Sequence, residues 1–139
     1  MTVLVGEVMS KNVVTCRADT TLVEVAMLMR DHDIGDVLVI DEREVRGIVT
    51  DRDIVIRGLA SGADVRQETV ATVCTEDPAT VSADTSVEEA ERVMRERAVR
   101  RLPVVDGNRA IGILSLGDLV IEREGASTLA DISAAAPDD

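Results

Sequence analysis

Two short segments of the sequence place a hydroxyl side chain three residues before an aspartate. Thr50 precedes Asp53, and Ser115 precedes Asp118. Each hydroxyl residue follows an apolar run that contains a glycine, so the spacing predicts the first turn of a helix after a strand. Free N–H groups at a helix start favour an anion such as phosphate. An aspartate in that turn, facing an open cleft, can accept two hydrogen bonds from the adjacent hydroxyls of a ribose.

The same spacing also has a purely structural interpretation. A Thr or Ser cap followed by an acidic residue at the third helical position stabilises a helix by about 1 kcal/mol without any ligand. One copy of the motif favours this structural role. Its presence twice, each time directly after a glycine-containing apolar strand, shifts the interpretation towards a ligand site.

The two motifs belong to a longer internal repeat. Residues 8–57 align without a gap with residues 73–122, and identical pairs include Asp19-Thr20 with Asp84-Thr85, Met29-Arg30 with Met94-Arg95, and Gly47-Ile48 with Gly112-Ile113. Each copy predicts the order β-α-β-β-α, which gives an α/β (α+β) fold of tandem repeats packed as a pseudo-twofold pair. The expected organisation is repeat 1 at 5–60, a linker at 61–69, repeat 2 at 70–124 and a flexible tail at 125–139.

Local patterns place the elements within each copy. The expected strands are residues 13–16, 37–40 and 45–49 in the first copy and 79–81, 102–105 and 110–114 in the second. Thr21 with Glu24, and Ser86 with Glu89, have the spacing of a capping box at the start of a helix; the first of these helices should end near residues 32–33. Gly47 and Gly112, in the middle of strands, predict a close approach of other backbone.

Composition excludes several classes of partner. The 139 residues carry a net charge of −12 and contain no Phe, Tyr or Trp, which disfavours nucleic-acid binding and rules out aromatic cages. No apolar run approaches the roughly 20 residues that span a bilayer, and no signal peptide is evident, so we expect a cytoplasmic protein with no membrane partner. Cys16 and Cys74 lack metal-binding spacing and His32 is the single histidine, so we expect reduced thiols, no metal site and no catalytic centre.

The repeated segments resemble a pair of CBS domains, the motif named from cystathionine β-synthase. The resemblance is carried by Gly-Ile-Val-Thr-Asp-Arg-Asp at 47–53, Gly-Ile-Leu-Ser-Leu-Gly-Asp at 112–118 and Arg-Arg-Leu-Pro-Val-Val-Asp at 100–106, and it covers about residues 5–123. Residues 31–35 and 50–60 are similar to stand-alone bacterial CBS-pair proteins, including the hypoxic-response type of actinobacteria. The resemblance implies two clefts between the repeats, commonly occupied by AMP, ADP, ATP or S-adenosylmethionine.

The resemblance also implies roles for individual residues. It maps the ribose-binding carboxylate onto Asp53 and Asp118 and the phosphate-side hydroxyl onto Thr50 and Ser115. It assigns adenine contacts to the backbone and aliphatic side chains of the first strand of each copy, namely Val14, Thr15, Cys16, Ala79 and Thr80. It assigns closure of the pocket to the second strand, which contains Pro103 in the second copy.

Three arginines are further candidates for contact with phosphate. Arg52 follows Thr50 by two residues, and Arg100 and Arg101 stand where the first copy has Gly35 and Asp36. Guanidinium groups hold oxyanions in a bidentate manner, whereas a surface arginine is often only solvated. We therefore expect the two sites to differ, with more positive charge in the second copy.

Together these features predict a non-catalytic regulatory module that senses adenosine-containing ligands and needs no catalytic cofactor. We expect a homodimer formed through helical faces at residues 23–27 and 54–56, which signals to an unidentified downstream protein. The alternative is a dimeric interaction scaffold with degenerate clefts. Asp36, an extra carboxylate in the first cleft, favours that alternative for the first copy.

Overall fold

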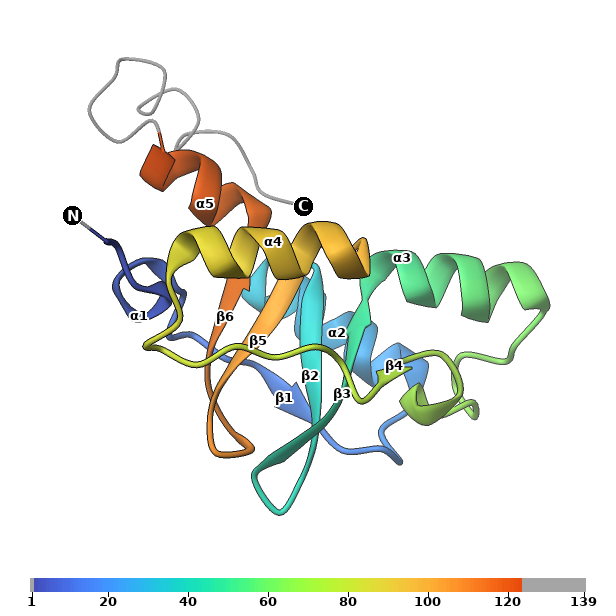
Figure 1. Ribbon diagram of the computed structural model, residues 1–139. Helices are drawn as coiled ribbons and strands as arrows, with labels where there is room; N and C mark the ends of the chain where they lie inside the picture. Colours follow the sequence, from blue (N-terminus) through green and yellow to red (C-terminus); the bar gives the residue numbers. More distant parts are fainter. Residues whose placement is uncertain (1, 124–139) are drawn as a thin grey trace. The chain divides into compact units, whose positions relative to one another are not determined.

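The computed structural model describes residues 2–123, and each repeat contains the predicted order helix, strand, strand, helix (Figure 1). In chain order the elements are α1 (Val5–Val8), β1 (Thr15–Cys16), α2 (Leu22–His32), β2 (Asp36–Asp41), β3 (Glu44–Thr50), α3 (Asp51–Asp53), β4 (Thr75–Glu76), α4 (Val87–Arg97), β5 (Arg101–Asp106), β6 (Arg109–Ser115) and α5 (Leu116–Arg123). The repeat did not predict α1 or β4. The mixed α/β class is confirmed. The tail expected at 125–139 lies outside the described residues.

The chain forms two compact units that do not coincide with the sequence repeats. Among the described residues, the first unit comprises residues 13–78, and the second comprises residues 2–12 together with residues 79–123. Residues 61–69, expected as a linker, therefore lie inside the first unit. Each unit takes one short segment from the other repeat: Val70 N donates to Thr20 O at 2.8 Å, and Val5 N donates to Thr85 O at 2.8 Å.

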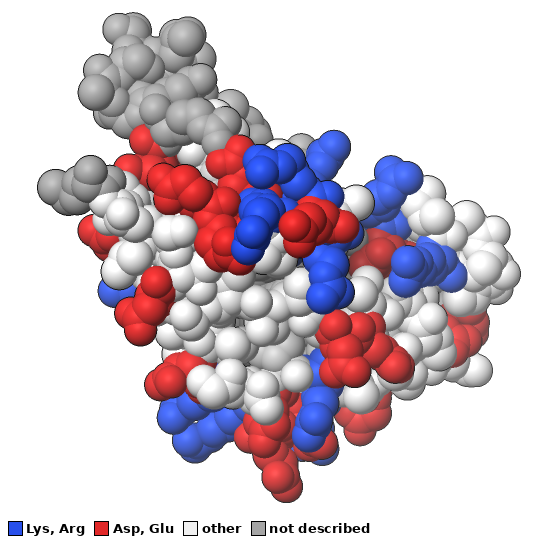
Figure 2. Space-filling view, in the orientation of Figure 1, with Lys and Arg blue, Asp and Glu red and all other residues white. Residues whose placement is uncertain are grey.

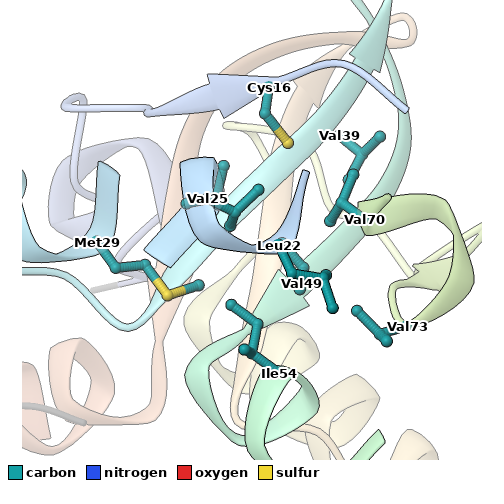
Figure 3. Close-up of a cluster of buried hydrophobic side chains, with 10 residues drawn as sticks. Cys16, Leu22, Val25, Met29, Val39, Val49, Ile54, Val70 and Val73 are labelled. Carbon is teal, nitrogen blue, oxygen red and sulfur yellow. The ribbon is translucent and has the colours of Figure 1, made fainter. Parts of the chain in front are cut away.

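A small sheet and one helix enclose the core of the first unit. β1 pairs in parallel with β2, β2 pairs antiparallel with β3, and β3 pairs antiparallel with β4. Figure 3 shows the side chains that pack between this sheet and α2. Leu22, Val25, Val37, Val49 and Val70 are fully buried there, and each such side chain contributes about 1.5–3 kcal/mol through removal from water.

The second unit repeats this arrangement. β5 and β6 form an antiparallel hairpin. Its register shifts between Val104 and Val105, as the register of β2 and β3 shifts between Val39 and Ile40. The strand expected at 79–81 is reduced to a single parallel bridge between Val81 and Val104. Val5 of α1 is fully buried in this core, which explains why the N-terminal segment belongs to this unit.

The predicted helix caps are confirmed, with one difference. Thr21 Oγ1 accepts from Glu24 N, and Glu24 Oε1 accepts from Thr21 N at 3.0 Å, which completes a capping box on α2. On α4, Ser86 Oγ accepts from Glu89 N at 3.2 Å, but the Glu89 carboxylate binds Arg92 instead. This ion pair belongs to the interspersed acidic and basic side chains along α4 in Figure 2.

The close approaches predicted at the strand glycines are also present. A Cβ atom on Gly47 would lie 2.9 Å from Thr75 O, and one on Gly112 would lie 2.9 Å from Ser10 O. Real Cβ atoms do not approach a carbonyl oxygen this closely. Glycine at these two positions therefore lets the segment that contains Thr75 lie against β3, and the segment that contains Ser10 lie against β6.

The helix after β3 differs from a regular α-helix. Three residues of α3 continue into a π-helical turn at Ile54–Gly58 and a 3₁₀ turn at Leu59–Ser61. Ser61 Oγ donates to Arg57 O at 2.6 Å and ends the segment. The expectation that residues 54–56 form one contact face is wrong for Ile54, which is buried in the core, whereas Val55 and Ile56 are exposed.

Candidate functional site

In the first unit, Thr50 and Asp53 bind each other through reciprocal hydrogen bonds. Thr50 N donates to Asp53 Oδ2 at 2.9 Å, and Asp53 N donates to Thr50 Oγ1 at 3.2 Å. These bonds satisfy two donors that helix formation would otherwise leave unpaired. The cap uses Oδ2 of the carboxylate, so Oδ1 takes no part in it and the orientation of the group is fixed before any ligand arrives.

Ser115 and Asp118 form the same arrangement in the second unit. Ser115 N donates to Asp118 Oδ2 at 2.8 Å, and Asp118 N donates to Ser115 Oγ at 3.1 Å. Ser115 is buried, and it is the last residue of β6, directly before α5. The structure thus brings together each predicted carboxylate and its hydroxyl, at the same position in both units.

Strand alternation places both hydroxyls on the sheet face that points away from the core of their unit. Val49 and Leu114 face the cores, so Thr50 and Ser115, one residue later, face the opposite side. Opposite Thr50 in the β2–β3 register lies Asp36, and opposite Ser115 in the β5–β6 register lies Arg101. Directly opposed side chains lie about 4.5–5.5 Å apart at Cβ. The two candidate sites therefore carry opposite charges beside the hydroxyl.

The candidate residues of the first strand divide between the two faces of the sheet. Cys16 is buried in the first core and Val14 packs against it, so Thr15 between them points to the face that carries Thr50. The side chains of Val14 and Cys16 therefore cannot line the same surface as Thr50. They can offer only main-chain groups, and Val14 O already accepts from Leu38 N at 3.0 Å.

The second unit divides its candidates in the same way. Ala79 and Val81 pack in the second core, so the exposed Thr80 between them points to the other face. Leu102 and Val104 face the core of the second unit, so Arg101 and Pro103, which alternate with them along the strand, point to the opposite face. Pro103 is fully buried on that face. Thr80, Pro103, Arg101 and Ser115 thus share one face of the second unit.

The remaining arginine candidates lie at the surface. Arg52 is exposed, and its main-chain N–H donates to Asp51 Oδ1 at 2.8 Å. Arg100 is exposed, and its carbonyl accepts from Leu116 N at 2.8 Å, which fixes the start of α5. Arg57 Nη1 donates to Val73 O at 3.4 Å. This bond joins segments 16 residues apart, so local sequence patterns did not predict it.

Burial dominates the acid–base chemistry of the two thiols in the first unit. It raises the pKa of Cys16 from 9.0 to about 11, with a further rise from the neighbouring Cys74. Burial also raises the pKa of Cys74, as do the carboxylates of Glu76 and Asp53, whereas Arg57 lowers it. Cys74 Sγ lies against the glycine of β3, where a Cβ on Gly47 would lie 3.1 Å from it.

Two further properties concern metals and membranes. Among residues 2–123, no group of three or more His, Cys, Asp or Glu side chains is arranged to hold a metal ion. No helix in this part of the chain has the length and apolar composition needed to cross a bilayer.

Comparison with known proteins relates this geometry to a family. The CBS domain family matches residues 5–59 and 70–125. Hypoxic response protein 1 of Mycobacterium tuberculosis is 40% identical over 108 residues, which are 76% of this chain and 76% of that protein. The structure of a hexameric CBS-CP12 protein from bloom-forming cyanobacteria is similar with a TM-score of 0.78 and 30% identity, and covers 84% of this chain and 69% of that one.

A third relative was crystallised with ligands. The CBS domain pair of protein MJ0100, in complex with 5′-methylthioadenosine and S-adenosyl-L-methionine, is similar with a TM-score of 0.82 and 26% identity, and covers 90% of this chain and 98% of that one. The matched ranges contain both hydroxyl–aspartate pairs and both glycine-containing strands. The chain therefore belongs to the CBS-domain family, and its two sequence repeats are tandem CBS domains.

Proposed function

We propose that this protein is a non-catalytic regulatory module that binds adenosine-containing ligands. The observation that carries the proposal is the occurrence of the same oriented carboxylate, Asp53 or Asp118, at the same position of both units. A carboxylate held by a backbone N–H loses little further freedom when it accepts hydrogen bonds from a ribose diol, which lowers the cost of binding. The adenosine compounds bound by the MJ0100 pair support this ligand class.

The surroundings of the hydroxyls suit a ligand with an apolar base and a polar end. Thr15, Leu38 and Ile48 form one row across three strands of the first unit, on the face that carries Thr50. Aliphatic side chains can hold a purine through burial alone, and the chain has no aromatic residue for stacking. The base would lie against aliphatic groups and the ribose against the carboxylate.

The charge beside each hydroxyl gives the two units different preferences. Arg101 is opposite Ser115, so the second unit would favour a phosphorylated ligand such as AMP, ADP or ATP. Asp36 is opposite Thr50, so the first unit would favour an uncharged or sulfonium ligand such as S-adenosylmethionine. The same Asp36 supports the alternative function, a protein-interaction scaffold, if the first unit binds no ligand at all.

Self-association would use the exposed apolar side chains of the helices. On the first unit these are Met27, Val55, Ile56 and Leu59, and on the second they are Leu116, Val120 and Ile121. Val55 and Ile56 match Val120 and Ile121 in the repeat, and exposed apolar patches are typical of an interface. We propose a homodimer through these faces, which transmits ligand binding to a downstream protein in a signalling or stress response in the cytoplasm.

The test is a thermal-shift and calorimetric panel of adenosine, AMP, ATP, 5′-methylthioadenosine and S-adenosylmethionine. A ligand at 100 times its Kd adds about 2.7 kcal/mol to the free energy of unfolding. Asp53→Asn and Asp118→Asn keep an oxygen for the cap but remove the charge, so each should weaken binding about tenfold or more while it leaves the fold intact. Asp41→Asn, at an exposed strand end, is the matched control.

The outcome separates the two candidate functions. No shift with any compound, or an unchanged affinity in the Asp53→Asn, Asp118→Asn double variant, would overturn the proposed sites. A dimer without nucleotide response would support the scaffold.

A further inference from the structure

The sequence contains a single aspartate that is followed by glycine, Asp106–Gly107, and it lies at the turn of the β5–β6 hairpin. Asp106 ends β5 and pairs with Arg109, which begins β6, so a two-residue turn joins the strands. The turn projects beyond the strands in Figure 1 and is exposed. The proposed function gives no role to this end of the hairpin, because Arg101 and Ser115 lie at the other end.

The bond between Asp106 and Gly107 is unshielded. Apart from the two residues beside Gly107, no atom lies within 4 Å of the position that a Cβ on Gly107 would occupy. The φ of Gly107 is +66°, a left-handed conformation that glycine adopts without steric cost. Because Gly107 has no side chain, nothing hinders the approach of the Asp106 carboxyl group to the Gly107 nitrogen when the turn fluctuates.

The equivalent turn of the first unit lacks this freedom. Asp41 occupies the position of Asp106, but the residue that follows it is Glu42, whose Cβ crowds the backbone nitrogen. Asp41 Oδ2 also lies 3.9 Å from Arg46 Nε. Ile111 stands at the position of Arg46 in the second unit, and no ion pair among residues 2–123 engages the Asp106 carboxylate. Two restraints on the aspartate of the first turn are therefore missing in the second.

We propose that Asp106 is a modification site that isomerises to an isoaspartyl residue in the folded protein, with water as the only co-reactant. The Gly107 nitrogen forms a bond with Asp106 Cγ and a Cγ–O bond breaks; the oxygen leaves as water with the amide proton and one proton from solvent. Water then adds to the main-chain carbonyl carbon of Asp106 in this cyclic imide, and the bond from that carbon to the Gly107 nitrogen breaks. The nitrogen regains a proton, and the new carboxyl group releases one to solvent. The chain now runs through Cγ, and its mass is unchanged.

Isomerisation changes the backbone of the turn. It adds one carbon atom to the main chain after Asp106, so the pairing of Asp106 with Arg109 is lost. The Tm of the isomerised protein should therefore be lower by about 3 °C.

The test is prolonged incubation of the full-length protein at neutral pH, with a parallel sample in urea. Endoproteinase Asp-N cuts before aspartate but not before isoaspartate, so the native protein should lose the cut before Asp106 and retain the cut before Asp41. The native rate should lie within about tenfold of the rate in urea, because an exposed turn opens at little cost. An isoaspartyl carboxyl methyltransferase should label the same peptide. Retention of the cut before Asp106 in the native protein, or equal conversion of Asp41, would overturn the proposal.

Variants exchange the features of the two turns. Gly107→Ala should protect Asp106, because the new side chain crowds the attacking nitrogen. Glu42→Gly with Arg46→Ile gives the first turn both features of the second, so Asp41 should then convert as well. Conversion of Asp106 at the wild-type rate in Gly107→Ala, or an unconverted Asp41 in the double variant, would contradict the control of the reaction by these residues.

Discussion

Replacement of Gly112 by alanine tests how the N-terminal segment is held in the second unit. The new Cβ would lie 2.5 Å from Met9 Sδ and 2.9 Å from Ser10 O. The methionine side chain can move, but the carbonyl is fixed because Ser10 and Ile113 exchange two backbone hydrogen bonds of 2.9 Å. Relief of the contact would strain or break these bonds.

The expected loss follows from these contacts. Overpacking costs about 1–3 kcal/mol and each weakened hydrogen bond about 1 kcal/mol, so we expect a loss of ~3 kcal/mol in the free energy of unfolding. For 139 residues the entropy of unfolding is ~0.3 kcal/mol/K, which converts this loss to a Tm lower by ~10 °C.

The assay is thermal and urea unfolding of Gly112→Ala beside two other variants. Gly107→Ala is the matched control: no atom lies within 4 Å of its Cβ, and its φ of +66° costs only about 1 kcal/mol. Met9→Ala in the Gly112→Ala background should recover little, because the contact with Ser10 O remains. A Gly112→Ala protein within about 0.5 kcal/mol of the wild type would refute the reasoning.

Two further predictions concern pH. Hydrogen bonds from Thr21 lower the pKa of Glu24. The carboxylate of Glu24 therefore stabilises the fold above its ordinary pKa of 4.5, and this stabilisation is lost as the pH falls below that value. Glu24→Gln should flatten the acid limb of a Tm–pH curve, and Glu89→Gln is the control because Glu89 lies at the equivalent position without the reciprocal bond. Burial raises the pKa of Cys16 to about 11, so at pH 8 its alkylation should be roughly 100-fold slower in the native protein than in urea, as measured by mass spectrometry; equal rates would contradict its burial.

The sequence by itself determined the local features of this protein. The repeat predicted the order of helices and strands, and the spacing of Thr21 and Glu24 predicted a capping box that the structure contains. Gly47 and Gly112 were predicted to admit other backbone, and both do. These features depend on residues a few positions apart or on backbone conformation, which side-chain type controls directly.

The local signals failed where distant packing competes with them. Ile54 was expected at a helical surface, but the π-helical turn places it in the core, where it packs with Leu22 and Val49. Glu89 has the spacing of a capping box, but the carboxylate binds Arg92 instead, because a nearby guanidinium is an alternative partner.

Only the tertiary structure decided how the two repeats are assembled. The sequence divides near residue 65, but the compact units exchange their initial segments, because Val5 and Val70 each complete a core built from the other repeat. The same long-range pairing brings Cys74 to the sheet that contains Cys16. The sequence cannot reveal this exchange of segments between the repeats. Val5 and Val70 would be buried among apolar side chains in the core of either repeat, so their apolar character does not say which core they join.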